Sequence, residues 1–312
     1  MAVTRPLLCA LLTLAGESAA QSPAKPAQLP EFRVGSERVM LTATAVDRRG
    51  RVVRDLRENE LRVLEDGRLQ RLVHFDTAQQ QPARILLLVD TSGSMASGEK
   101  TTSTRMALVQ LLATLAPEDE LALVGFDKEY REWVPATRDH ARILESFDKL
   151  THFGSTALHD ALDRAARELV KLDGRRAIVV LTDGVDTSSR ATADEVIERS
   201  RALDVPIYAV SVLSPLDDPA SPSFAGRERP SAPTAGSAVL ARYAALSGAA
   251  AFVVSDFAAL RAAMLTIAGE LKHQYLLGYD PPAGPPSFRR IEVRTTRKGV
   301  SVRTRSGYLP TT

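Results

Sequence analysis

The sequence is poor in features that identify several common classes of protein. Its 312 residues include one cysteine, Cys9, which lies near the amino terminus. The rest of the chain can therefore form no disulfide, and its stability must come from packing and from any metal that it holds. The formal net charge is only +2. A near-neutral chain gives no indication that nucleic acid or an anionic membrane is its partner.

Long hydrophobic runs are also missing. The apolar stretch 7–15 is far shorter than the about 20 residues that a membrane-spanning helix needs, and no other segment is long enough to cross a membrane. Arg5 precedes this stretch and Ser18-Ala19-Ala20 follows it, an order typical of a secretory signal. We therefore expect residues 1–20 to be a signal peptide and the mature chain to be a bacterial periplasmic or extracellular protein. A short anchor that is never cleaved is the alternative.

Patterns that would indicate an enzyme are absent as well. Ser94 is not part of a Gly-x-Ser-x-Gly elbow, and the Ser-x-x-Lys spacing of Ser97 and Lys100 lacks the companion motifs of penicillin-recognising enzymes. The sequence has no glycine-rich phosphate loop, no dinucleotide fingerprint and no His-x-x-x-His pair. We therefore expect a protein that is not an enzyme. His159 is expected to pack or to lie at the surface.

The most informative feature that is present is Asp90-Thr91-Ser92-Gly93-Ser94-Met95, which follows the apolar run 83–89. Such a run is typical of a buried parallel strand, and ligands bind at the carboxyl ends of these strands in open α/β sheets. Asp90, Ser92 and Ser94 place hard oxygen atoms on one side of a tight loop. Oxygen ligands suit Mg²⁺ or Ca²⁺ and do not suit zinc.

Two later segments complete a larger set. Thr156 stands at a predicted helix start, and Asp183 follows a second apolar run, 177–182. Together the segments resemble the metal-ion-dependent adhesion site of von Willebrand factor type A domains, in which Asp-x-Ser-x-Ser is followed by a distant Thr and a distant Asp. All five positions match in order: Asp90, Ser92, Ser94, Thr156 and Asp183.

The resemblance implies a role for each of these residues. Ser92, Ser94 and Thr156 would reach Mg²⁺ through their hydroxyls, while Asp90 and Asp183 would supply negative charge directly or through water. Mn²⁺ or Ca²⁺ would also suit these ligands. In the related domains, a Glu or Asp of a partner protein fills the remaining metal position.

The expected function is therefore a secreted or periplasmic module that binds a protein or peptide presenting Asp or Glu. Two alternatives stay open. One is a structural or assembly factor whose metal stabilises the site, and the other, ranked last, is a metal-dependent hydrolase. Asp186 has two possible roles, as a neighbour that supports the metal ligands or as a solvated loop residue.

The composition changes several times along the chain. Residues 21–31 have the composition of a linker, and an amino-terminal β unit is expected at 32–78. From 83 to 272, apolar strand patterns alternate with helical ones, which is typical of a parallel sheet with helices on both faces. The expected strands are 84–89, 121–126, 177–182, 206–212, 250–254 and an edge strand near 131–134, and the expected helices are 103–115, 139–149, 156–171, 192–203, 237–246 and 257–272.

The Pro- and Ser-rich segment 214–237 interrupts this alternation, and its composition leaves open whether it is a flexible surface insertion or a recognition loop. Residues 273–312 are β-like again. In the amino-terminal unit, the Asp-Gly at the end of 61–67 predicts a hairpin with 70–75. The carboxy-terminal strands are expected to pack against this unit or to join it, because an isolated hairpin is marginal in water.

Three flanking motifs extend the resemblance to a bacterial group of secreted proteins related to von Willebrand factor type A domains. They are Glu65-Asp66-Gly67, Tyr275-Leu276-Leu277-Gly278-Tyr279 and Ser306-Gly307-Tyr308. The resulting fold class is α/β. We expect a doubly wound, mostly parallel, Rossmann-like sheet with a small flanking β unit built from the amino- and carboxy-terminal segments.

Overall fold

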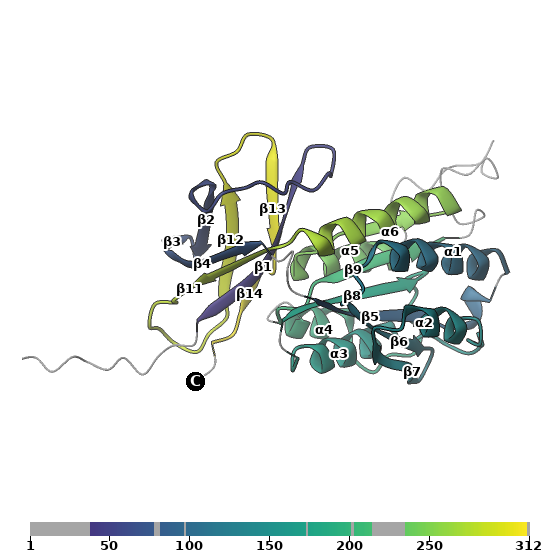
Figure 1. Cartoon of the computed structure of the whole chain (residues 1–312). Helices are drawn as coiled ribbons and strands as arrows, with labels where there is room; N and C mark the ends of the chain where they lie inside the picture. The colour runs from purple at the N-terminus through teal and green to yellow at the C-terminus, as the bar shows by residue number, and fades with distance from the viewer. Residues whose placement is uncertain are drawn as a thin grey trace, which may run out of the picture. The chain divides into compact units, whose positions relative to one another are not determined.

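The structure is a computed structural model that describes residues 38–77, 82–96, 98–172, 174–200, 203–213 and 235–310. The predicted signal peptide 1–20, the predicted linker 21–31 and residues 214–234 of the predicted insertion lie outside the described residues. Figure 1 shows that the described residues form an α/β domain and a β unit. No helix in this part of the chain is both long enough and apolar enough to span a bilayer.

A six-stranded sheet forms the centre of the α/β domain, with the strand order β10-β9-β8-β5-β6-β7. The first five strands of this order run parallel, and β7 is antiparallel to β6. Strand β9 is wholly buried and β5 and β8 nearly so, which explains their continuous apolar sequences. The strands are Ala83–Asp90 (β5), Glu120–Phe126 (β6), Tyr130–Thr137 (β7), Arg175–Thr182 (β8), Ile207–Val212 (β9) and Ala251–Val254 (β10).

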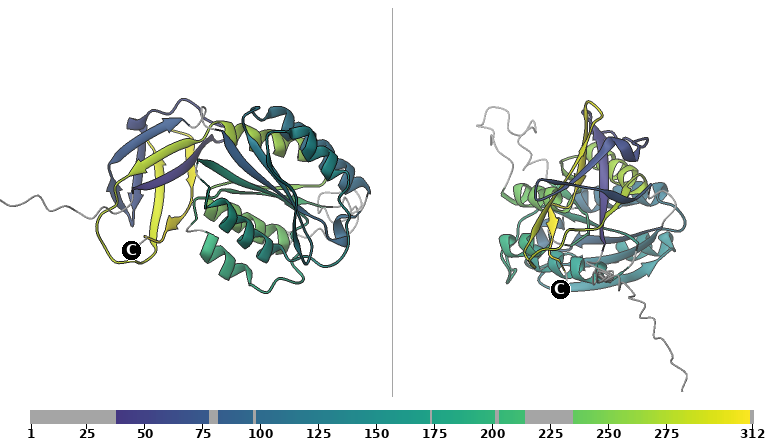
Figure 2. Two further views of the ribbon diagram at one scale, coloured as in Figure 1. Left: turned by 60° about the horizontal axis from the view of Figure 1, so that its bottom comes forward. Right: turned by 90° about the vertical axis from the view of Figure 1, so that its left-hand side faces the viewer.

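Helices cover both faces of this sheet, as Figure 2 shows. Apolar side chains of α1, α2 and α6 pack on one face, and those of α3, α4 and α5 pack on the other. The predicted fold class is thereby confirmed. The helices are Gly98–Thr114 (α1), His140–Phe147 (α2), Leu158–Leu169 (α3), Ala193–Ser200 (α4), Ala235–Ser247 (α5) and Phe257–Lys272 (α6).

Helix α1 begins five residues earlier than the predicted start at 103. Its first turns are polar, so they carry no apolar periodicity that would have revealed them. This extension brings Lys100 into the helix and next to the predicted metal site.

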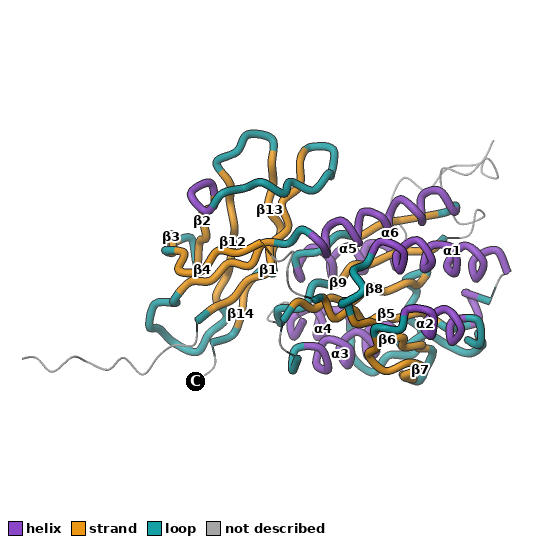
Figure 3. The backbone as a smooth tube through the Cα atoms, in the orientation of Figure 1, coloured by secondary structure: helices purple, strands orange, loops and turns teal. Residues whose placement is uncertain are grey.

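The β unit consists of two four-stranded sheets, with the strand orders β13-β1-β11-β4 and β14-β12-β2-β3 (Figure 3). All pairs in both sheets are antiparallel. Buried apolar side chains from both sheets form one core. The strands are Val39–Asp47 (β1), Leu61–Glu65 (β2), Arg68–Gln70 (β3), Leu72–Thr77 (β4), Tyr275–Tyr279 (β11), Arg289–Thr295 (β12), Val300–Thr304 (β13) and Gly307–Tyr308 (β14).

The predicted hairpin between 61–67 and 70–75 is only partly correct. The Asp66-Gly67 turn exists, with positive φ at both residues, but it joins β2 to the short strand β3. Strand β4 crosses to the other sheet and pairs with β11. This crossing places Leu72 and Phe75 against the core of the β unit.

The carboxy-terminal strands join the amino-terminal ones. Strand β12 pairs with β2, and β13 pairs with β1. The two consecutive strands β12 and β13 therefore belong to different sheets. The β unit is built from both ends of the described chain, as predicted for the fold class.

The three flanking motifs meet at one buried carboxylate. Tyr279 and Tyr308 donate hydrogen bonds from their hydroxyls to Oε2 of Glu65, at 2.6 and 3.0 Å. Nη1 of Arg289 donates to Oε1 of Glu65 at 2.9 Å and to the carbonyl of Pro282 at 2.7 Å. Glu65 and Arg289 are 3% and 8% exposed as side chains. The cluster links β2, β11, β12 and β14, and hence both sheets of the β unit.

Polar contacts also join the β unit to the α/β domain. Arg303 on β13 forms an ion pair with the buried Glu270 near the end of α6. Oγ1 of Thr42 donates to Asp204, whose carboxylate also lies 3.8 Å from Arg305. The described residues from 38 onward belong to one compact unit. The residue limits of the predicted domains, 32–78, 83–272 and 273–312, stay a prediction.

Candidate metal centre

Asp90 is the last residue of β5 and is fully buried at the end of the central sheet. Its Oδ1 accepts a hydrogen bond from the backbone N of Ser92 at 2.8 Å, and its Oδ2 accepts one from Oγ1 of Thr182 at 2.6 Å. The same Thr182 hydroxyl accepts from the N of Gly184 at 3.0 Å. These bonds tie the end of β5 to the neighbouring end of β8.

Ser92 and Ser94 lie on the tight loop after β5, where a short 3₁₀ turn covers Gly93–Met95. Their hydroxyl oxygens are 3.1 Å apart. The side chain of Met95 is buried in the core, as expected for a residue that packs and does not bind metal. The structure thus places the three predicted ligands of this loop together.

Thr156 stands two residues before α3 begins, so its predicted place at a helix start is nearly correct. Backbone hydrogen bonds join the loop that carries Thr156 to the loop after β5 and to the loop after β8. The N of Gly93 donates to the carbonyl of Gly154 at 3.2 Å, and the N of Thr187 donates to the carbonyl of Thr156 at 2.9 Å. The three segments that carry the five predicted residues therefore meet at one edge of the sheet.

Asp183 begins the loop after β8, and the glycine next to it is required by the backbone. Gly184 has a φ of 83°, and a Cβ at this position would lie 2.8 Å from the backbone carbon of Gly236 at the start of α5. Only a residue without a side chain fits this approach. For Gly93 the structure shows no such need, because φ is not positive and a Cβ would meet only a carbonyl oxygen at 3.8 Å.

The electrostatic setting of this centre favours a cation. Burial raises the pKa of Asp90 above its usual value, and the negative charge of Asp183 adds to the rise, although hydrogen bonds from Ser92 and Thr182 oppose it. Two close carboxylates at a buried strand end repel each other unless positive charge lies between or beside them. The hydroxyls at the same place are hard neutral ligands, so the set fits a hard divalent ion.

Asp186 and His159 have structural partners. Asp186 accepts hydrogen bonds from the N of His159 at 3.1 Å and from the N of Ser189 at 3.1 Å, so it caps the first turn of α3 and orders its own loop. Nδ1 of His159 lies 3.2 Å from the hydroxyl of Tyr243, and burial lowers the pKa of this histidine. The packing role predicted for His159 agrees with these contacts.

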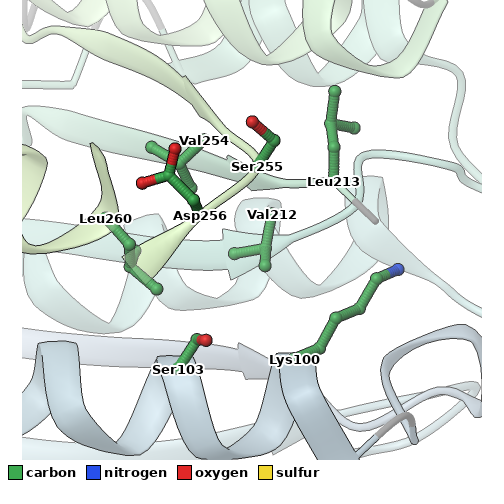
Figure 4. A pocket seen from close by; sticks show the side chains of 8 residues that line it. All are labelled: Lys100, Ser103, Val212, Leu213, Val254, Ser255, Asp256 and Leu260. Carbon is green, nitrogen blue, oxygen red and sulfur yellow. The ribbon is translucent and has the colours of Figure 1, made fainter. Parts of the chain in front are cut away.

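Two residues of the centre were not predicted from the sequence. One is Thr182, which fixes Asp90. The other is Lys100, whose Nζ donates to the carbonyl of Ser94 at 3.1 Å and lies 3.7 Å from Oδ2 of Asp183. Figure 4 shows Lys100 and Ser103 of α1 facing the ends of β9 and β10 across a small pocket. Thr182 directly precedes Asp183, and this adjacency is the one sequence signal that could have identified it.

The candidate centre contains few charged ligands. In the part of the chain that the structure describes, no three side chains of His, Cys, Asp or Glu converge so that they could hold a metal. The set of two carboxylates and three hydroxyls relies on neutral oxygens instead. The assignment of these five residues as metal ligands stays a prediction.

Comparison with known families gives a match over this part of the chain. Residues 85–185 match the family model described as von Willebrand factor type A domain. Over these residues the chain is similar to von Willebrand factor type A domains. This match includes all five residues of the candidate centre and indicates a protein-interaction module.

Curated relatives share this domain over part of their length. The chain is 30% identical over 131 residues to inter-alpha-trypsin inhibitor heavy chain H4 of Bos taurus, and 33% identical over 119 residues to that of Homo sapiens. These matches cover 37% and 34% of this chain but only 14% and 13% of the relatives. The chain therefore spans a small fraction of the length of the curated relatives it matches.

A solved structure shows the same fold over more of the chain. The von Willebrand factor type A protein from Catenulispora acidiphila aligns with a TM-score of 0.50 at 13% identity. The alignment covers 89% of this chain and 75% of that one. At this identity the similarity concerns the fold alone.

Proposed function

We propose that this protein captures a carboxylate of a partner protein or peptide through a divalent cation at the edge of its von Willebrand factor type A domain. Ser92, Ser94 and Thr156 would supply hydroxyl ligands, and Asp90 and Asp183 would supply the negative charge. Mg²⁺ is the cation that we expect, and Mn²⁺ or Ca²⁺ would fit the same ligands. The bound cation would supply an electrophilic position for an Asp or Glu side chain.

The observation that supports this proposal is the convergence of three distant segments at the ends of β5 and β8. Each of these residues lies at a strand end or on a loop, and hydrogen bonds join each of the three segments to another of them. Such preorganisation lowers the entropic cost of assembling a metal site. An ordinary α/β domain has no reason to gather two carboxylates and three hydroxyls in this way.

The proposal includes export of the protein. The support is the arrangement of Arg5, the apolar stretch 7–15 and the small residues that follow it. A periplasmic or extracellular module would meet partners on other exported proteins. Fractionation of the native cells, with detection of the protein by antibody, tests this part of the proposal, and recovery in the cytoplasm alone would contradict it.

The metal site is tested by calorimetric titration of the mature protein with MgCl₂. We expect Asp90→Ala and Asp183→Ala to remain folded and to bind Mg²⁺ at least roughly tenfold more weakly, because each variant removes a charged ligand. Asp76→Ala removes an exposed carboxylate on β4 and serves as the matched control. Equal Mg²⁺ affinity in the wild type and in both site variants would contradict the assignment of these residues as metal ligands.

The partner is tested with the same variants. Immobilised wild-type protein is mixed with the native exported fraction in Mg²⁺ or in chelator, beside immobilised Asp90→Ala in Mg²⁺. A protein retained only by the wild type in Mg²⁺ is the expected result, and modification of its carboxyl groups is expected to abolish retention. A partner retained equally in all three conditions would contradict capture through the metal.

A further inference from the structure

We propose that Lys100 sets the cation affinity of the metal centre by holding Asp183 in an ion pair that competes with the bound cation. This inference rests on the proposed function and concerns the same site. Lys100 belongs to α1, whereas Asp183 follows β8 in a distant part of the sequence. The pair therefore links the helix that follows the serine loop to the second carboxylate of the centre.

The geometry places the ammonium group of Lys100 directly beside predicted metal ligands. Its Nζ lies 3.7 Å from Oδ2 of Asp183 and donates to the backbone carbonyl of Ser94 at 3.1 Å. The side chains of Lys100 and Asp183 are only 8% and 12% exposed. At such low exposure, screening by water and salt is weak, so the two charges act strongly on each other.

The position of Lys100 on its helix supports a role for its charge. Lys100 is the third residue of α1. A positive charge in the first turn of a helix is unfavourable, because the helix dipole places partial positive charge there. Burial of an ammonium group adds a further cost. A lysine at this place needs a compensating anion, and the carboxylate of Asp183 supplies one.

Lys100 has apolar neighbours as well as the polar partners of its ammonium group. The pocket in Figure 4 is lined by Lys100 and Ser103 and by the apolar side chains of Val212, Leu213 and Leu260. Asp256, also on this pocket, accepts a hydrogen bond from the N of Ala259 and caps α6. A methionine at position 100 would keep an unbranched apolar side chain there and would remove the charge together with the hydrogen bond to the carbonyl of Ser94.

A cation held by Asp183 would stand close to this ammonium group. The two positive charges repel each other, and both draw on the same carboxylate. Removal of the lysine charge therefore leaves Asp183 fully available to the cation. The expected result is tighter cation binding, whereas removal of a ligand weakens it.

The test is calorimetric titration with MgCl₂ of the wild type and Lys100→Met. We expect Lys100→Met to bind Mg²⁺ roughly tenfold more tightly, because one nearby positive charge is lost. Lys171→Met is the matched control. It removes the same charge from an exposed position just beyond α3, and α3 begins beside the centre and runs away from it. Its Mg²⁺ affinity is expected to equal that of the wild type.

A second measurement separates the charge effect from loss of structure. In chelator, Lys100→Met is expected to melt at a lower temperature than the wild type, because Asp183 loses its partner. Saturating Mg²⁺ is expected to raise the melting temperature of the variant more than that of the wild type. Lys100→Gln keeps a donor for the carbonyl of Ser94 and is expected to behave like Lys100→Met. It takes the place of Lys100→Met if the methionine variant does not fold.

The outcomes distinguish this inference from the function on which it rests. Mg²⁺ binding that depends on Asp90 but is unchanged or weakened in both Lys100 variants would overturn the role of Lys100 alone. Absence of Mg²⁺ binding in the wild type and in both variants would overturn the metal centre itself. Tighter Mg²⁺ binding in the Lys100 variants, with unchanged Mg²⁺ affinity in Lys171→Met, would support both the metal centre and the role of Lys100.

Discussion

At the scale of single residues, Thr182 determines how Asp90 is held. Its hydroxyl donates to the buried carboxylate of Asp90 and accepts from the backbone of Gly184, so one oxygen atom fixes a residue on each of two strand ends. A hydrogen bond to a charged, buried group contributes more to stability than a hydrogen bond at the exposed surface. Thr182 is therefore a positioning residue for the centre.

Thr182→Val keeps the shape of the side chain and removes the hydroxyl. We expect the free energy of unfolding to fall by about 2 kcal/mol, because a buried carboxylate loses a donor. Urea denaturation measures this difference. Thr266→Val on α6, whose exposed hydroxyl donates to the carbonyl of Ala262, is the control and is expected to change stability by less than about 0.5 kcal/mol. Equal effects of the two substitutions would contradict the role of Thr182.

The limits of prediction at this scale have a physical cause. Asp90, Ser92 and Ser94 follow an apolar strand, and this local pattern places them at the edge of a sheet. Lys100 belongs to no such pattern, and Thr182 merely ends the second apolar strand; the importance of both comes from contacts with residues far away in the sequence. Asp186 is the opposite case. It lies near the motif in the sequence, but its observed contact caps helix α3.

At the scale of elements, the strands and helices of the α/β domain were predictable and the pairing of the β unit was not. Buried parallel strands are continuous apolar runs, and β5, β8 and β9 were recognisable for that reason. In the β unit, β2 finds its partner β12 more than 200 residues later. No local turn signal records such a pairing, and the Asp66-Gly67 turn indicated only the short hairpin with β3.

The buried Glu65 holds these distant strands together, and its replacement is expected to destabilise the protein. Glu65→Gln leaves Arg289 buried without its carboxylate, so we expect a loss of about 3 kcal/mol in the free energy of unfolding. Glu292→Gln on β12 removes an exposed ion pair with Arg294 and is expected to cost less than about 1 kcal/mol. Chemical denaturation of both variants measures the difference, and a similar small loss in each would show that the cluster is not needed.

At the scale of the whole molecule, charge is divided between the two parts. The β-rich segments 38–77 and 273–310 contain 16 basic and nine acidic residues, whereas residues 82–272 contain 21 basic and 26 acidic ones. The near-neutral total therefore conceals two regions of opposite sign. Contacts between the two regions follow this division. Arg303 on β13 pairs with Glu270 of the α/β domain, and Arg305, just after β13, approaches Asp204 of that domain.

The junction is expected to make the described chain unfold as one unit. Helix α6 is separated from β11 by only two residues, and the ion pair between Glu270 and Arg303 joins the two parts where α6 ends. The carboxylate of Glu270 is buried, and its partner Arg303 is partly so. A single calorimetric transition is therefore expected for the wild type.

Glu270→Gln removes the charge that pairs with Arg303 while preserving size. We expect it to lower the free energy of unfolding by about 2 kcal/mol, discounted from a fully buried pair because Arg303 is partly exposed. Differential scanning calorimetry measures the fall in melting temperature. Glu168→Gln, in an exposed pair with Arg164 on α3, is the control and is expected to change little. Two separate transitions in the wild type would contradict the coupling, because the β unit would then unfold independently of the domain that carries the metal centre.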